Sequence, residues 1–298
     1  MPYIVKDIPI TLWFGGAISM YKLNVIKTTV KAGLEKPVKF LHITDTHIAL
    51  DDPERFSGRA AGCFEGEHTG RTVELFKSAL RYAKSNNLTI VHTGDLIDFF
   101  SKNNFKAVEE LFPKSIDYIY AAGNHDFCHW VGEAKEDYEY KWNNIKVIAP
   151  YIKSNLYFDS RVIGGLNIVT MDDSYYMISD GQTEMLKAEV AKGYPILLCM
   201  HVPLYGPSCK ESIEGGAVEL QVGIPEKYLA NYPEERQRQT RPDEATLRAI
   251  GYIKNEPMIK ALITGHIHRN VEERLDSGLL QIATGGTFDG YVREITVI

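Results

Sequence analysis

Short apolar runs alternate with helically spaced apolar residues along most of the chain. The runs Val38–Thr44, Leu88–Thr93 and Ile116–Ala121 have the length and composition of buried strands. Between the first two, apolar residues recur every three or four positions over Arg71–Ser85 and predict a helix. Strands that alternate with helices are typical of an α/β protein.

The same alternation continues to the C-terminus and predicts mixed sheets. Further strands are expected at Leu166–Met171, Ile196–Met200, Ile259–Thr264, Leu279–Ala283 and Tyr291–Val297, and further helices at Phe105–Phe112, Gly181–Ala191 and Glu244–Lys254. The last strands follow one another too closely for crossover helices, so some of them must pair in the antiparallel sense.

The N-terminal residues 1–36 are expected to form a β-hairpin that packs on the core. Gly15-Gly16 separates two β-rich runs, Ile8–Phe14 and Ile18–Val30. The uncharged stretch around this turn is too short to span a bilayer and follows Lys6 and Asp7 rather than a positively charged segment. We therefore expect a cytoplasmic protein with no membrane partner.

The remaining residues 37–298 read as one domain with two long polar stretches. Residues 51–71 and 205–243 are rich in Gly, Glu and Arg and lack sustained periodicity, so we interpret them as lid-like loops. Their arginines could bind a phosphate substituent, and a solvated surface is an equally good interpretation. Tyr205 could stack on a base or pack internally.

Composition narrows the class of protein further. The chain has 298 residues, 44% hydrophobic and 24% charged, which is a globular composition with a net charge of −6. This charge disfavours capture of long nucleic acids. The four cysteines form no Cys-x-x-Cys pair, so we expect reduced thiols of an intracellular protein.

Polar residues with metal-binding side chains follow five of the predicted strands. They are Asp45, His47, Asp95, Asn124, His125, His201, His266 and His268. Carboxyl ends of strands converge on the ligand crevice of an α/β sheet, so these residues can meet in space. Asp, Asn and His donors suit Mn, Fe or Zn ions. These candidate ligands are too many for one tetrahedral site and suit two ions that share a carboxylate.

Other polar residues have structural interpretations. His42 and His92 lie inside predicted strands, and His68 and His129 lie in or near loops. Asp172 and Asp173 follow a strand without a paired histidine and are expected to cap it or form a turn.

In chain order, five blocks resemble the calcineurin-like metallophosphoesterase superfamily. They are Asp45-Thr46-His47, Gly94-Asp95, Gly123-Asn124-His125-Asp126, His201 and Gly265-His266-Ile267-His268. The resemblance implies a four-layer α/β sandwich of two mixed sheets flanked by helices. It also implies that Asp45, His47 and His268 bind one metal ion, that Asn124, His201 and His266 bind a second, and that Asp95 bridges them. His125 would be the general acid, oriented by Asp126.

The implied activity is hydrolysis of a small phosphate ester, favoured to be a phosphodiester or a nucleotide, by attack of a metal-bound hydroxide. The alternatives are a phosphomonoesterase or protein phosphatase, a nuclease, and a non-catalytic scaffold of the same fold. A nuclease needs a basic track along its cleft, and the sequence has no basic run of that kind. The oligomeric state stays open.

Overall fold

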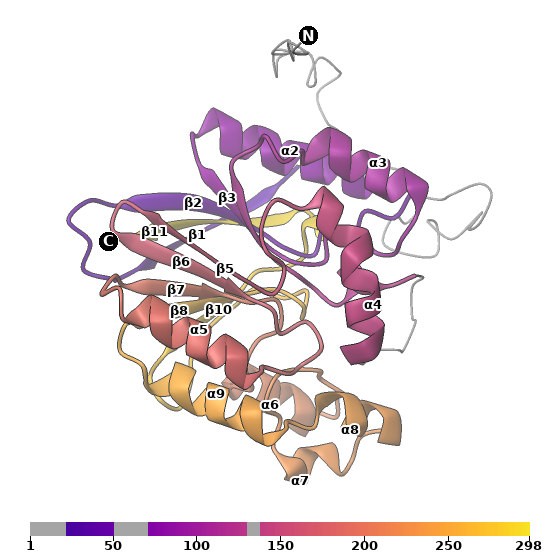
Figure 1. Ribbon diagram of the computed structural model, residues 1–298, viewed down its shortest axis with the longest axis vertical. Coiled ribbons are helices and arrows are strands. Elements are labelled where there is room, and N and C mark those ends of the chain that lie inside the picture. The colour runs from indigo at the N-terminus through magenta and orange to yellow at the C-terminus, as the bar shows by residue number, and fades with distance from the viewer. Residues whose placement is uncertain (1–21, 51–70, 130–137) are drawn as a thin grey trace.

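Two stacked β-sheets flanked by helices make up the part of the chain that the computed structural model describes, residues 22–50, 71–129 and 138–298. Helices α2 (Arg71–Ser85) and α3 (Lys102–Leu111) cover the outer face of one sheet, and α5 (Asp180–Val190) and α9 (Glu244–Asn255) cover that of the other (Figure 1). The four-layer α/β sandwich of mixed sheets is therefore confirmed.

The first sheet has five strands in the order β1-β11-β2-β3-β4. Their bounds are β1 Asn24–Val30, β2 Val38–Ile43, β3 Thr89–Thr93, β4 Tyr118–Ala121 and β11 Tyr291–Val297. Strands β2, β3 and β4 are parallel, whereas β11 runs antiparallel to β2 and parallel to β1. The last strand of the chain, β11, thus lies between β1 and β2.

The second sheet has six strands in the order β5-β6-β7-β8-β10-β9. Their bounds are β5 Phe158–Ile163, β6 Leu166–Met171, β7 Ile196–Cys199, β8 Ile259–Thr264, β9 Val271–Arg274 and β10 Leu280–Ala283. The four central strands are parallel, and β5 and β9 pair antiparallel at the two edges. Both sheets therefore aim several carboxyl ends toward one end of the sandwich.

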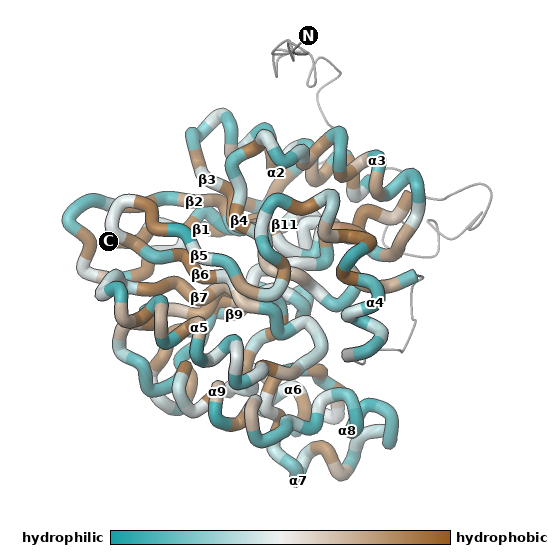
Figure 2. The backbone as a smooth tube through the Cα atoms, viewed as in Figure 1, coloured by the Kyte–Doolittle hydropathy of each residue, from teal (hydrophilic) through white to brown (hydrophobic). Residues whose placement is uncertain are grey.

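Three apolar layers hold the sandwich together. In β2, Leu41 and Ile43 face the core under the helices, whereas Phe40 faces the second sheet. In β7, Leu198 and Leu197 alternate in the same way between helices and the first sheet. A strand buried on both faces is apolar at nearly every position, which explains the continuous apolar runs in the sequence (Figure 2).

Caps set the beginnings of several helices. Ser179 and Gln182 form a reciprocal capping box at the start of α5, and the Ser101 and Asp243 side chains accept backbone N–H bonds at the starts of α3 and α9. Gly193, with φ +78°, lies in the turn after α5.

The polar stretch 205–243, which we interpret from the sequence as a lid-like loop, is partly helical. This segment contains α6 (Pro207–Glu214), α7 (Glu226–Leu229) and α8 (Glu234–Thr240), and we call it the helical insertion. Cys209, Ile224, Leu229 and Tyr232 form its small buried core. Helices of four to eight residues are too short to show periodicity, which is why the pattern missed them.

Six further elements of the described chain were not predicted. The edge strands β5 and β9 are only partly buried, so they lack a continuous apolar run. Helix α4 (Tyr138–Ile148) mixes aromatic, polar and apolar residues without a clear apolar stripe. Short 3-10 helices, η2 (His125–Phe127), η3 (Ala149–Tyr151) and η4 (Thr287–Asp289), complete the list.

Two predicted features lie wholly or mostly outside the described residues. The first run of the N-terminal hairpin falls there, while part of the second run forms β1, which pairs in parallel with β11. Nearly all of the first polar stretch, residues 51–71, falls there too, as do His68 and Cys63. The described cysteines, Cys128, Cys199 and Cys209, are buried. No helix in the described ranges has both the length and the apolar composition needed to cross a membrane.

Candidate metal centre

The structure brings all seven predicted ligands together at one end of the sandwich. Asp45, Asp95 and Asn124 follow β2, β3 and β4 of the first sheet within three residues. His201 and His266 each follow their strand of the second sheet, β7 and β8, at the same short distance. The site therefore lies where the carboxyl ends of both sheets meet.

Five of these ligands have a left-handed backbone conformation. Asp45, His47, Asp95, His266 and His268 have φ between +46° and +65°. Such values are uncommon outside glycine and gather at functional sites, where surrounding structure holds the chain in place. The conformation turns the chain sharply after each strand and aims the side chain across the sheet end.

Glycines before the ligands allow backbones to approach closely. A Cβ on Gly94 would collide with the backbone of Gly123, and a Cβ on Gly123 would collide with Asp95. A Cβ on Gly265 would collide with Thr44 and with the Asp45 carboxylate. The space each glycine leaves is filled by neighbouring backbone and by the ligand side chains.

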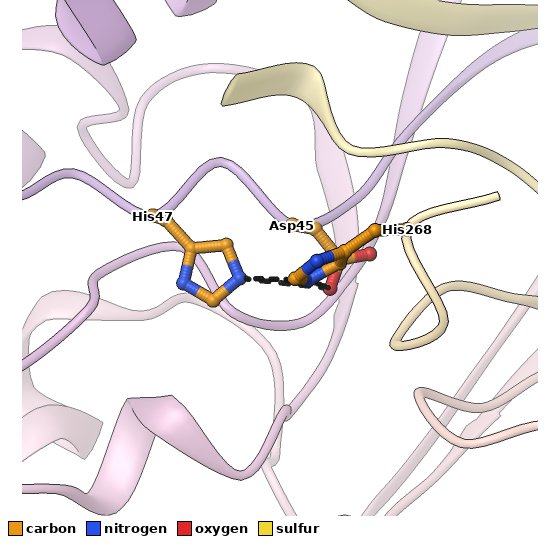
Figure 3. A group of neighbouring side chains, drawn as sticks. All are labelled: Asp45, His47 and His268. Carbon is orange, nitrogen blue, oxygen red and sulfur yellow. Dashed lines mark hydrogen bonds and ion pairs between the residues drawn. The ribbon is translucent and has the colours of Figure 1, made fainter. Parts of the chain in front are cut away.

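The first group of ligands consists of Asp45, His47 and His268 (Figure 3). His268 Nε2 lies 3.2 Å from Asp45 Oδ1 and 3.2 Å from His47 Nε2. Asp45 and His47 are fully buried, and the His268 side chain keeps 34% of its exposure. This group can be reached from solvent on the His268 side.

The second group consists of Asn124, His201 and His266. Asn124 Oδ1 lies 3.2 Å from His201 Nε2 and 3.2 Å from His266 Nδ1. The two ring nitrogens are 3.3 Å apart. Three polar atoms from three different strand ends therefore point at one place.

Asp95 stands between the two groups. Its Oδ2 is 3.6 Å from His47 Nε2 and 3.2 Å from His201 Nε2. Its Oδ1 accepts the backbone N–H of His125 at 2.8 Å. One carboxylate oxygen is thus tied to the backbone, and the other is shared by the two groups.

These atoms fit metal ligation better than hydrogen bonding. His47 Nδ1 faces Asp98 Oδ1 at 3.0 Å and His201 Nδ1 faces the Thr93 carbonyl at 2.6 Å, so each Nδ1 carries the proton when its ring is neutral and each Nε2 offers a lone pair. Bonds of about 2.0–2.2 Å to one ion place its ligands about 3.0–3.5 Å apart. Most of the observed separations, 3.2–3.3 Å, fall in that range, and His47 Nε2 lies slightly farther, at 3.6 Å from Asp95 Oδ2 and 3.8 Å from Asp45 Oδ1.

His125 lies beside the groups and keeps 23% of its exposure. Its Nδ1 is 2.9 Å from Asp98 Oδ1, the same oxygen that faces His47. Burial opposes a charge on this ring, but the Asp95 and Asp98 carboxylates outweigh it and raise the pKa of His125 to about 10. The ring is therefore held charged, with Nε2 free of the Asp98 contact.

The expectation that Asp126 orients His125 is not met, because Asp98 holds that place. Asp126 accepts the backbone N–H groups of Asp95, Leu96 and Gly123 at 2.8–3.0 Å and the Tyr120 hydroxyl at 2.5 Å. It thereby braces two of the ligand-bearing turns. Burial raises its pKa to about 6, and the Asp95 charge adds to the rise.

Asp98 was missed by the sequence reasoning although a signal for it exists. It follows Asp95 by three residues in Gly94-Asp95-Leu96-Ile97-Asp98 and is fully buried. A second aspartate that close to a ligand indicates a supporting carboxylate.

The protonation of the ligand histidines differs between them. Burial opposes charge on His201, but Asp95 outweighs it and raises its pKa to about 10. Burial and the nearby His201 lower the pKa of His266 to about 3. A metal ion at this site would therefore compete with a proton for His201 but not for His266.

The histidines outside the site, and Tyr205, make structural contacts. His42 bonds the Thr284 and Thr93 hydroxyls, and His92 bonds the Thr46 hydroxyl. His129 bonds Asn144, and Tyr205 packs in the helical insertion near Tyr228. These contacts agree with the structural interpretations.

Asp172 and the described arginines are also engaged. Asp172 accepts the backbone N–H of Ser174 in a turn and pairs with the buried Lys141. Arg71 pairs with Asp289 and Arg241 with Glu226 on exposed surfaces, which agrees with the solvated interpretation of the arginines.

Comparison with known proteins gives a family and several similar folds. The family model for calcineurin-like phosphoesterases matches residues 38–270. No curated protein matches the chain.

Among solved structures, a dimetal phosphatase from Danio rerio is 14% identical with a TM-score of 0.49, covering 85% of this chain and 88% of that one. A purple acid phosphatase from yellow lupin seeds is 14% identical with a TM-score of 0.49, covering 86% and 44%. A 5'-nucleotidase from Candida albicans is 14% identical with a TM-score of 0.43, covering 90% and 47%.

Proposed function

This chain belongs to the calcineurin-like phosphoesterase family, whose members are metal-dependent phosphoric ester hydrolases, and from that premise we propose that it hydrolyses a small phosphate ester at a centre of two metal ions. The favoured substrate is a phosphodiester or a nucleotide. The observation that carries the proposal is the single oxygen, Asp95 Oδ2, that faces His47 Nε2 at 3.6 Å and His201 Nε2 at 3.2 Å. One shared carboxylate between two ligand groups is the arrangement that two-ion phosphoester hydrolysis requires.

The two groups divide the ligands between the ions. Asp45, His47 and His268 would hold one ion, and Asn124, His201 and His266 the other, with Asp95 common to both. When bound, such ions activate water as a nucleophile and neutralise phosphate oxygens, and Mn, Fe or Zn fits these donors.

The protein's own contribution to proton transfer comes from His125. Asp98 accepts the Nδ1–H of this ring and leaves Nε2, on the partly exposed side, to donate a proton to the departing oxygen. Because Asp98 is fully buried and also holds His47, the acid and a ligand of the first group keep a fixed spacing. We assign His125 as general acid and Asp98 as the residue that positions it.

A small substrate fits the charge and surroundings of the site. The net charge of −6 works against long polyanions. Arg269, directly after the ligand His268, pairs with Glu219 of the helical insertion at 2.9 Å. The insertion is thereby fixed next to the loop that carries two ligands, and we propose that it limits the size of the substrate.

The test is a side-by-side assay of a chromogenic phosphate diester and the matching monoester, using the full chain with added Mn²⁺. Faster cleavage of the diester supports the phosphodiesterase assignment. Faster cleavage of the monoester redirects it to a phosphatase or nucleotidase. Cleavage of neither, with two ions bound, contradicts the proposal and favours a scaffold.

Asp95→Asn is the sharpest variant for the shared ligand. An amide nitrogen in place of Oδ2 cannot ligate two ions, so we expect a loss of about 10²-fold or more in kcat and of one bound ion per chain. Metal content by mass spectrometry and circular dichroism accompany the kinetics. Asp117→Asn, at an exposed aspartate paired with Arg161, is the matched control. Full activity of Asp95→Asn with two ions bound would refute the shared-ligand assignment.

A further inference from the structure

We propose that Asp173 is a positioning residue for the second metal group, holding His201 in place through its backbone. This inference rests on the proposed two-metal function. Asp173 follows β6 and lies beside the end of β7. It is absent from the family blocks that the sequence contains.

The geometry shows what the carboxylate holds. Asp173 Oδ1 accepts the backbone N–H of His201 at 2.9 Å and that of Val202 at 3.1 Å, and its Oδ2 lies 3.2 Å from the same Val202 nitrogen. The His201 ring is fixed separately by the Thr93 carbonyl. His201 is therefore held at both its backbone and its ring.

The backbone of His201 is also bonded to the loop that carries His266, the other histidine of the second group. The carbonyl of His201 accepts the N–H of Gly265 at 2.9 Å, and Gly265 directly precedes His266. Moving His201 thus moves the start of the loop that carries His266. Asp45 and His47 of the first group are held differently, through backbone bonds to the carbonyls of Gly94 and Asp95.

The Asp173 carboxylate is buried, and a negative charge in the protein interior is destabilising. Asp173 is fully buried, and none of the described lysines or arginines pairs with it. Its neighbour Asp172, equally enclosed, pairs with Lys141 Nζ at 2.7 Å. A buried carboxylate without a cation is destabilising unless N–H donors compensate it, and here those donors belong to a proposed ligand and its neighbour.

The experiment titrates the metal-free full chain with Mn²⁺. Calorimetry gives the two affinities, and electron paramagnetic resonance distinguishes a coupled pair of Mn²⁺ ions from isolated ones. Asp173→Leu keeps the approximate size of the side chain but removes both acceptor oxygens, so the N–H groups of His201 and Val202 lose their partner. We expect the affinity for the second ion to fall about 10–100-fold, with the coupled signal replaced by that of isolated Mn²⁺.

Asp172→Asn is the matched control, because it disturbs a buried carboxylate next in sequence that contacts no ligand. We expect it to lower thermal stability while the chain still binds two coupled ions. Asp173→Ser, whose shorter side chain cannot bond both N–H groups, serves as a second variant should Asp173→Leu fail to fold.

The outcomes separate this inference from the function on which it rests. A wild-type chain that binds two ions, beside Asp173 variants that fold and bind both with unchanged affinity, overturns the inference alone. An equal loss of the second ion in Asp172→Asn also overturns it, because the effect is then general loosening. A wild-type chain that does not bind two ions overturns the proposed function as well.

Discussion

At the scale of single residues, the candidate site is built from backbone as much as from side chains. Five ligands adopt left-handed φ values, which cost free energy that the surrounding hydrogen bonds must offset. Asp126 supplies one of these bonds by accepting the N–H of Asp95, and Asp173 holds the backbone of His201 in a similar way. Buried carboxylates can therefore serve the site without ligating metal or touching substrate.

The role of His125 can be tested through the leaving group. A general acid matters most when the departing oxygen is strongly basic, so His125→Ala should lower kcat by about 10²–10⁴-fold for an alkyl ester and much less for a nitrophenyl ester. Steady-state kinetics on the two esters measure the ratio. His129→Ala, four residues later and bonded to Asn144, is the control and should leave the ratio unchanged. Equal losses on both esters in His125→Ala would argue against an acid.

At the scale of elements, the helical insertion and α9 show how local signals fix structure near the site. Asp243 ends the insertion and caps α9, accepting the Thr246 N–H at 2.7 Å. Thr246 in turn bonds the Ile178 backbone through its hydroxyl. The cap therefore joins the insertion to the layer outside the second sheet.

Removal of this cap should affect stability and leave chemistry intact. Asp243→Ala is expected to lower the free energy of unfolding by about 1 kcal/mol, because an N–H at the start of α9 loses its acceptor. Urea denaturation measures the change, and the Mn²⁺-dependent kcat should stay at the wild-type value. Unchanged stability would mean that water replaces the aspartate fully.

The pKa values of two buried histidines in the strands predict how the free energy of unfolding depends on pH. Burial lowers the pKa of His42 in β2 and of His92 in β3 to about 3, whereas in the unfolded chain these rings titrate near 6.5. Below 6.5 the unfolded chain binds more protons, so the stability that these rings contribute is present above pH 6.5 and is lost as pH falls toward 3.

His42→Gln should flatten that dependence. The glutamine does not titrate, so the slope of unfolding free energy against pH between 6.5 and 4 should decrease by up to about 1.4 kcal/mol per pH unit. Urea unfolding at several pH values measures both slopes, and the absolute stability of the variant does not enter the comparison. Parallel curves would show that His42 does not titrate on unfolding.

At the scale of the whole molecule, the candidate metal centre joins the two halves of the sandwich. Asp45, His47, Asp95 and Asn124 come from the first sheet, and His201, His266 and His268 come from the second. Metal ions held by these residues would cross-link the two sheets at the carboxyl ends of their strands. Metal binding should therefore stabilise the fold as a whole.

Removal of metal should lower Tm, by an amount that depends on pH. Each ion at 100 times its Kd contributes about 2.7 kcal/mol. In the metal-free chain the raised pKa of His201, about 10, gives stability that is present below pH 6.5 and lost as pH rises toward 10. Metal needs the unprotonated ring, so the Tm difference between Mn²⁺-loaded and chelator-treated protein should be larger at pH 8 than at pH 6.5. A difference that shrinks with pH would contradict this assignment.

The sequence by itself determined the elements whose pattern is unambiguous and the residues that carry chemistry. Strands buried on both faces gave continuous apolar runs, and helix α2 follows the predicted Arg71–Ser85 because its apolar stripe is regular. Eight metal-binding side chains were found because they directly follow such runs, and the resemblance to the family separated the seven ligands from His125. These signals are local, so they can be seen without a fold.

Only the tertiary structure decided the contacts between segments far apart in sequence. It put Asp98, not Asp126, against His125, because the turn after β4 points Asp126 back at the N–H groups of the β3 turn. It folded residues 205–243 into short helices around a shared core, and it placed Asp173 behind His201. Such contacts depend on how the two sheets stack, and the stacking of sheets produces no repeating pattern of residues in the sequence.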